Sequence, residues 1–261
     1  MENSVSNKPG DADRPELAVV VGATGAFGNR MVDRLVDAGL KVVAVARSAD
    51  SLAALQDRQP SIGVCVADIS DDASIEAIRA VLDRPVRAVV HGPGVGVAGG
   101  ILTAPTATMV DAVNIKVGGL LRLTRAADAH FTRGSRIIAI GGHYGLEPTA
   151  YAASAGVANA ALVNVSRQLS LAYGPRGVTA HVIAPGPADT ERLRNVAKAR
   201  ADQRGCSIDD VLEELKAESS IGAFTTPEQV AWAVAMLLDP CADAMTGSTL
   251  MLDSGRRKGL P

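Results

Sequence analysis

The chain has few aromatic side chains and no strong excess of charge of either sign. Phe, Trp and Tyr make up 3% of its 261 residues, whereas hydrophobic residues as a whole reach 47%. A hydrophobic fraction carried by small aliphatic side chains is typical of parallel strands buried between closely packed helices. The formal net charge of −2 and the pI near 6.1 leave no broad basic field, so we expect neither nucleic acid nor a membrane as a partner.

Cysteine is scarce, and no apolar run of the sequence reaches the length of a membrane-spanning helix. Cys65, Cys206 and Cys241 lie far apart without the spacing of a metal site, which favours reduced thiols in a cytoplasmic protein that binds no metal. Residues 1–15 are polar and lack the apolar stretch of a signal peptide. They are therefore predicted to form a disordered tail.

Short β-branched runs alternate with longer helical patterns between residues 16 and 255. The runs predict strands at 17–21, 41–46, 62–67, 86–91, 136–140, 178–184 and 248–253, and helices are expected near 26–38, 71–82, 106–129, 151–173 and 227–238. Strands separated by helices of this length imply right-handed crossovers and a parallel sheet. The sequence predicts one doubly wound α/β domain of the Rossmann type, with a seven-stranded parallel sheet flanked by helices and a C-terminal tail at 256–261.

A charged helical pattern over residues 189–220 interrupts this alternation after the sixth predicted strand. Ligands of open α/β sheets bind outside the carboxyl ends of the strands, so an insertion at this point would lie over the binding crevice. It is a candidate substrate lid. The alternative, a solvated helical pair with no gating role, stays open.

A glycine-rich turn follows the first predicted strand and opens a helix. Gly22, Gly25 and Gly28 recur at a three-residue spacing in VGATGAFG, with Thr24 and Phe27 between them. Glycine allows the tight turn, lets a pyrophosphate approach the backbone and lets the helix pack on the strand, while the helix N-terminus supplies amides. These five residues are predicted to bind a dinucleotide.

The second predicted strand ends in Arg47, with no acidic residue at its end. A carboxylate there would bind the ribose 2′-hydroxyl of NAD, whereas a guanidinium pairs with the 2′-phosphate of NADP. We therefore predict NADP(H), against the alternative of an exposed arginine at a strand end. Asp68, followed by Ile69, ends the third strand. Its carboxylate is a candidate contact to the adenine amino group, or a helix cap.

With these residues placed, the chain resembles the short-chain dehydrogenase/reductase family from about residue 17 to residue 255. The segments that carry the resemblance, in chain order, are VGATGAFG, Asp68, HGPG at 91–94, Asn114 in DAVNIKVGG, APGPADT at 184–190, TPEQVAWAVAMLL and MTGSTLMLDSG. The resemblance implies cofactor contacts at His91, Gly92, Pro185, Gly186 and Thr190, and a catalytic role for the helix-kink residue Asn114.

The resemblance also implies a Ser–Tyr–Lys catalytic set, from which this chain departs. Tyr151 in YAASA matches the tyrosine, but Ala155 stands at the lysine position, and Gly141 and Gly142 stand where the segment with the serine is expected. A phenol with a pKa of about 10 is a poor base at neutral pH without a nearby cation, so Tyr151 is expected to act as a hydrogen-bond donor. His143 is a candidate replacement for the proton donor or positioning group, the alternative being an ordinary loop histidine.

These observations favour an NADP(H)-dependent oxidoreductase with an atypical active site, acting on a small or medium-sized carbonyl, alcohol or activated double bond. Two alternatives stay open. One is a non-redox isomerase, lyase or cyclase that reuses the pocket, and the other is a catalytically inactive cofactor-binding regulator or scaffold. The small residues of the helix after Tyr151 indicate a homodimer or homotetramer, with burial within one subunit as the alternative.

Overall fold

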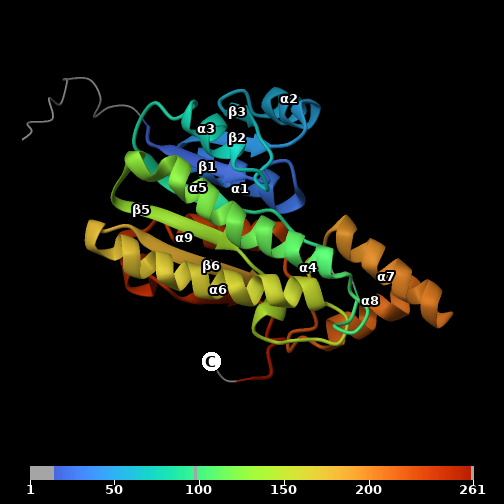
Figure 1. The fold of residues 1–261 in the computed structure, drawn as a ribbon. Helices are drawn as coiled ribbons and strands as arrows, with labels where there is room; N and C mark the ends of the chain where they lie inside the picture. Colours follow the sequence, from blue (N-terminus) through green and yellow to red (C-terminus); the bar gives the residue numbers. More distant parts are fainter. Residues whose placement is uncertain (1–14, 97–98, 260–261) are drawn as a thin grey trace, which may run out of the picture.

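A computed structural model describes residues 15–96 and 99–259 of the chain (Figure 1). Its seven strands form one parallel sheet in the order β3-β2-β1-β4-β5-β6-β7. They are β1 (Leu17–Val21), β2 (Lys41–Ala46), β3 (Gly63–Val66), β4 (Val86–His91), β5 (Phe131–Ile140), β6 (Thr179–Pro185) and β7 (Thr249–Leu252). The predicted fold class is confirmed.

Helices cover both faces of the sheet. They are α1 (Ala26–Asp37), α2 (Ala49–Arg58), α3 (Ala73–Arg79), α4 (Thr106–Val113), α5 (Gly119–Ala127), α6 (Ala153–Tyr173), α7 (Glu191–Arg204), α8 (Ile208–Ala217) and α9 (Pro227–Met236). One apolar core joins the sheet to α3, α5 and α6, and a second joins its other face to α1, α2 and α9. Strands covered on both faces explain the nearly continuous Val and Ala runs of the sequence.

Two parts of this helical layer differ from the sequence prediction. Helix α2 was not expected, although Ser48 caps it through Ser51 N at 3.1 Å and its Leu52 and Leu55 are buried against the sheet. The helix expected at 106–129 is divided, because a π-helical turn, Asn114–Gly118, separates α4 from α5. An extra residue in a helical turn changes the direction in which neighbouring side chains point, and such turns recur at functional sites.

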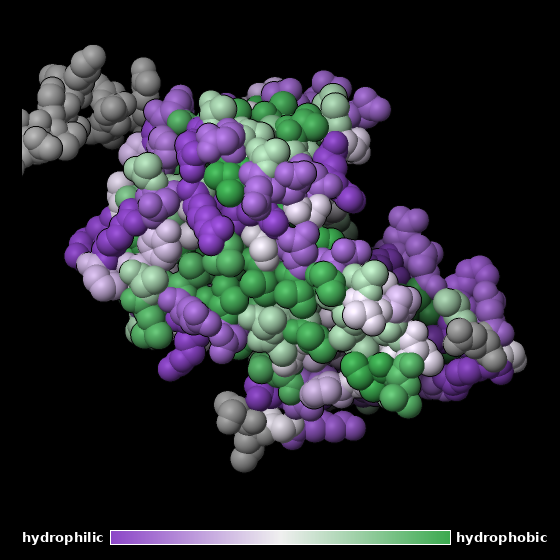
Figure 2. All heavy atoms as spheres, viewed as in Figure 1, coloured by the Kyte–Doolittle hydropathy of each residue, from purple (hydrophilic) through white to green (hydrophobic). Residues whose placement is uncertain are grey.

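The insertion at 189–220 forms α7 and α8, which extend from one end of the molecule (Figure 1). The two helices have a small apolar core of their own, made by Ala197, Ala201, Val211 and Leu215. Elsewhere their surface is mainly hydrophilic (Figure 2). The first turn of α7 lies next to the body of the domain and helps to line the cavity described below.

The two predicted tails have different outcomes. The N-terminal tail lies outside the described residues up to residue 14. At the other end, residues 256–259 of the predicted C-terminal tail pack against the domain: Arg256 is buried and donates to Leu215 O at 2.9 Å, and Gly259 N donates to Glu147 Oε1 at 2.8 Å. Among the described residues, no helix has both the length and the hydropathy needed to cross a bilayer.

Candidate functional site

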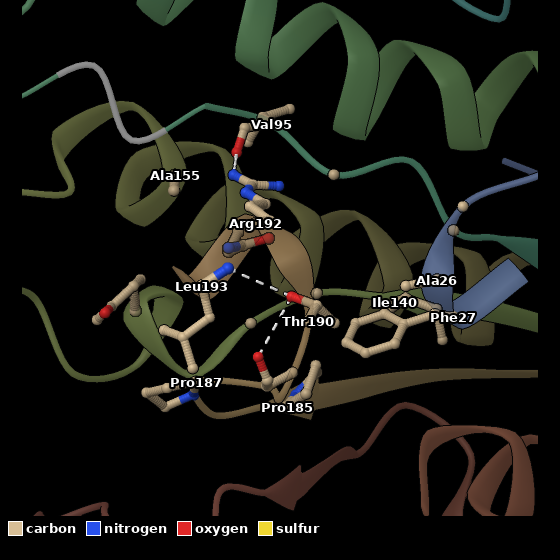
Figure 3. A pocket seen from close by; sticks show the side chains of 18 of the residues that line it. Ala26, Phe27, Val95, Ile140, Ala155, Pro185, Pro187, Thr190, Arg192 and Leu193 are labelled. Atoms are coloured by element: carbon tan, nitrogen blue, oxygen red, sulfur yellow. Dashed lines mark hydrogen bonds between the residues drawn. The ribbon is translucent and has the colours of Figure 1, made fainter. Parts of the chain in front are cut away.

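A cavity of about 490 Å³ opens at the carboxyl edge of the sheet, where β1 and β4 lie side by side (Figure 3). This is the point at which the strand order reverses, where open α/β sheets bind their ligands. The cavity is lined by the predicted site residues Gly22, Gly25, Phe27, Gly28, Gly92, His143, Tyr151, Pro185, Gly186 and Thr190. The fold thus brings together residues from six separate segments of the chain.

The glycine end of the cavity is built from backbone. Gly22 adopts a φ of +78°, which side chains disfavour, and a Cβ on Gly28 would lie 2.1 Å from Gly22 O. Gly25 is the N-cap of α1, and no side chain caps its amides. The first turn of α1 contains no acidic residue, so its N–H groups and positive dipole end are available to an anion in the cavity.

Four predicted cofactor residues lie outside the cavity lining. Arg47 is exposed directly after β2, and Asp68 lies after β3, where Ser70 donates to Asp68 Oδ1 from its backbone N at 3.0 Å and its Oγ at 2.7 Å. These hydrogen bonds, mainly, and the nearby charge of Arg47 lower the pKa of Asp68. Thr24 is partly buried in the glycine turn, and Ile69 is buried in the core.

Two more predicted site residues, His91 and Asn114, lie outside the cavity lining. His91 is fully buried beneath it, with Nε2 bonded to Ile115 O at 3.0 Å, and burial lowers its pKa to about 3. Asn114 donates to Ser70 O at 2.9 Å and accepts from Arg122 at 2.9 Å. Both side chains join neighbouring elements, because the π-helical turn directs Asn114 away from the cavity and Ile115 O toward His91.

Two phenols meet at the other end of the cavity. The hydroxyls of Tyr144 and Tyr151 are 2.8 Å apart, and the Arg200 guanidinium of α7 lies 3.8 Å from the centre of the Tyr151 ring. Burial and the hydrogen bond to Tyr151 raise the pKa of Tyr144. Tyr144 is therefore neutral at physiological pH and can donate a hydrogen bond, either to Tyr151 or to a ligand oxygen.

His143 lines the cavity but is held as a neutral imidazole. Its side chain is 3% exposed, and burial lowers its pKa to about 4, assisted by the charge of Arg256. A hydrogen bond to the Pro185 carbonyl opposes this shift. The neutral ring can donate or accept a hydrogen bond in the cavity, and the role of His143 as a proton donor or positioning group stays a prediction.

The cavity also contains polar groups that the sequence analysis did not select. Lys116, from the π-helical turn, is 3% exposed and donates to Ile140 O at 2.7 Å, and burial together with the charge of Arg192 lowers its pKa to about 7. Asn159 of α6 lines the same cavity. The sequence held one signal for Lys116: it stands in the apolar stretch IKVGGLL, and the nearest acidic residue, Asp111, is five positions away.

The start of α7 closes one side of the cavity (Figure 3). Thr190 caps the helix by accepting from Leu193 N at 3.4 Å, and the Arg192 guanidinium donates to Val95 O in the loop after β4. Burial lowers the pKa of Arg192. Residues of the inserted segment therefore form part of the cavity wall.

Comparison with known proteins agrees with this geometry. Residues 22–257 match the family described as enoyl-(acyl carrier protein) reductase. The chain is 27% identical to the short-chain reductase protein NovJ of Streptomyces niveus, covering 92% of this chain and 93% of NovJ, and 27% identical to the 3-oxoacyl-[acyl-carrier-protein] reductase FabG of Escherichia coli, covering 92% and 96%.

A solved structure of an actinorhodin polyketide ketoreductase variant with NADPH superposes with a TM-score of 0.85 at 25% identity, covering 94% of this chain and 98% of that one. The two proteins therefore share the same fold. On the match over residues 22–257, the chain belongs to the short-chain dehydrogenase/reductase family.

Proposed function

We propose that this protein is an NADP(H)-dependent oxidoreductase with an atypical active site, acting on a small or medium-sized carbonyl, alcohol or activated double bond. The observation that carries the proposal is one continuous cavity that runs from the uncapped N-terminus of α1 to the hydroxyl of Tyr151. A dinucleotide fits such a site, since one end offers amides to a pyrophosphate and the other offers hydrogen-bond donors to a reacting oxygen.

The preference for NADP(H) rests on the end of β2. Arg47 is exposed there and close enough to Asp68 to influence its pKa, so the 2′-phosphate of an adenosine bound across β2 and β3 would meet a guanidinium. The structure of the ketoreductase relative contains NADPH, which supports the same choice. Thr24 and Ile69 belong to this adenosine end.

The residues at the phenol end account for the remaining chemistry. Bound NADPH supplies the hydride. Tyr151 and Tyr144 donate hydrogen bonds to the substrate oxygen and hold it in place, and one of them can deliver a proton as the oxygen becomes an alcohol. Arg200 lies on the Tyr151 ring, fixes its orientation and favours any negative charge that develops on the phenol.

Two further features belong to the proposal. Helices α7 and α8 act as a lid, because Arg192 and Arg200 connect α7 to Val95 and Tyr151 at the mouth of the cavity.

Apolar side chains gather over the face that carries α5 and α6 (Figure 2), and Val110, Val157 and Leu171 of α4 and α6 are exposed. We expect copies of the chain to pair through this face, which sedimentation of the purified protein would test.

The first experiment is a fluorescence titration with NADPH and, in parallel, with NADH. We expect NADPH to bind in the micromolar range and NADH at least about tenfold more weakly. A screen of ketones, aldehydes and enones for NADPH oxidation then identifies the substrate class. Absence of binding by both cofactors would overturn the proposal.

A further inference from the structure

Burial of the charged Lys116 side chain is expected to destabilise the folded protein. A buried ammonium is strongly unfavourable unless it is paired, yet Lys116 makes one hydrogen bond, to the neutral carbonyl of Ile140. No carboxylate among the described residues raises its pKa, and the charge that acts on it is the like charge of Arg192. His91, on the neighbouring strand, is itself neutral. Among the described residues, no negative charge therefore offsets the cost of burying this ammonium.

Asn159, which lines the same cavity, has a side-chain acceptor without a hydrogen-bond donor among the described residues. Its side chain is 5% exposed, and its Oδ1 has no hydrogen-bond partner within the described part of the chain. An unpaired buried carbonyl oxygen costs about 1–3 kcal/mol. The cavity thus holds an ammonium with two unused N–H donors and an amide oxygen with an unused lone pair.

Small side chains make the room for this arrangement. Ala155 packs with Ala112 and Ala158 where α4 meets α6, and Ala155 lines the cavity together with Lys116. The π-helical turn brings Lys116 to that junction from the facing helix. A larger side chain at position 155 would reduce the free volume of this cavity.

We propose that Lys116 and Asn159 together bind a hydroxyl group of the ligand, with the ammonium donating to the hydroxyl oxygen and Asn159 Oδ1 accepting its proton. This inference rests on the proposed function. A hydroxyl satisfies both groups because it donates and accepts, whereas a carboxylate would leave Asn159 Oδ1 facing a second acceptor. The hydroxyl can belong to the sugar next to the nicotinamide or to the substrate.

The test compares the wild type with Lys116→Met, which keeps the length of the side chain and removes its charge. Lys41→Met is the matched control, because Lys41 also donates to one backbone carbonyl, that of Ser61, at the opposite edge of the sheet. Affinities for NADPH and for adenosine 2′,5′-bisphosphate are measured, with the KM of the best ketone from the screen and the melting temperature.

We expect Lys116→Met to melt at a temperature no lower than the wild type, since an uncompensated buried charge is removed. A sugar hydroxyl at this site predicts NADPH binding weakened about tenfold, and unchanged binding of the bisphosphate, which lacks the nicotinamide half. A substrate hydroxyl predicts unchanged NADPH binding and a KM raised about tenfold. Asn159→Leu is expected to change the same parameter in the same direction, and it decides the matter if Lys116→Met does not fold.

The outcomes separate this inference from the proposed function. A wild-type protein that binds no NADPH overturns the proposed function. A wild type that binds NADPH, with variants whose affinity and KM equal those of the wild type and of Lys41→Met, overturns only the role of Lys116 and Asn159. A lower melting temperature for Lys116→Met with unchanged binding and KM would assign the lysine to structure alone.

Discussion

The two ends of the cavity are built by different means. At the glycine end, Gly22, Gly25 and Gly28 leave space, and the amides of α1 supply the polar groups. At the phenol end, side chains from the π-helical turn, the loop after β5, α6 and α7 converge, among them Lys116, Tyr144 and Tyr151. A backbone site depends on local spacing along the chain, whereas a side-chain site depends on which segments the fold brings together.

The largest effect is expected at the glycine end. In Gly28→Ala the new Cβ would lie 2.1 Å from Gly22 O and 2.6 Å from Ala23 C, so the turn must open. We expect a loss of about 2–3 kcal/mol in the free energy of unfolding and no measurable NADPH binding. Denaturant unfolding and the NADPH titration measure both. Gly174→Ala is the control, because nothing lies within 4 Å of its Cβ position. Equal stability of the two variants would contradict the close approach.

Arg47→Asp tests whether the adenosine end selects the cofactor. Loss of a charged contact to the 2′-phosphate, with repulsion in its place, is expected to weaken NADPH binding about 100-fold, while NADH binding improves. Parallel titrations with the two cofactors give the ratio. Arg125→Asp, an equal change of charge at an exposed site on α5, is the control. An unchanged ratio in Arg47→Asp would remove Arg47 from the cofactor site.

The buried Lys116 at the phenol end of the cavity is expected to make the stability of the protein depend on pH. The pKa of Lys116 falls from 10.5 to about 7 in the folded protein, so between these values the unfolded chain binds more protons than the folded one. Stability therefore rises with pH across this window, and the penalty is complete below about pH 7. Melting curves of the wild type and Lys116→Met should converge as the pH rises. Parallel curves would show that Lys116 titrates normally.

Tyr151→Phe is expected to have a moderate effect. A hydrogen bond donated by a neutral phenol contributes about 1 kcal/mol, and the Tyr144 hydroxyl, 2.8 Å away, remains in the variant to hold the substrate oxygen and to deliver the proton. We expect kcat to fall by less than about tenfold, and by more in the variant that also carries Tyr144→Phe. Steady-state rates with NADPH and a ketone measure this. A fall of several orders of magnitude in the single variant would show that Tyr151 ionises during turnover.

His143→Ala is expected to leave the shape of the pH–rate profile unchanged. The imidazole has a pKa of about 4, so it stays neutral from about pH 6 to pH 8 and contributes no titration there. The rate itself can fall slightly through loss of packing against Tyr144, whose ring centre is 4.0 Å away. If one limb of the pH–rate profile disappeared in the variant, His143 would be identified as a proton donor.

The predictions from sequence follow the same division. The seven parallel strands and the tight turn at Gly22 were predicted correctly, because alternating patterns and glycine spacing are properties of short segments, whereas the order of the strands within the sheet came from the structure. Helix α2 was missed because its ten residues carry only two buried apolar side chains. The hydrogen bond from Asn114 to Ser70 O could not be predicted, because it depends on the π-helical turn and on a loop far away in sequence.

The sequence by itself determined a parallel α/β fold and a glycine turn that opens a helix after β1, since both depend on residues that are close along the chain. Only the tertiary structure decided that His143 is neutral, that Tyr144 pairs with Tyr151 and that Lys116 shares a cavity with Asn159. Burial and partners set the protonation and hydrogen bonding of a side chain, and they come from segments far apart in sequence.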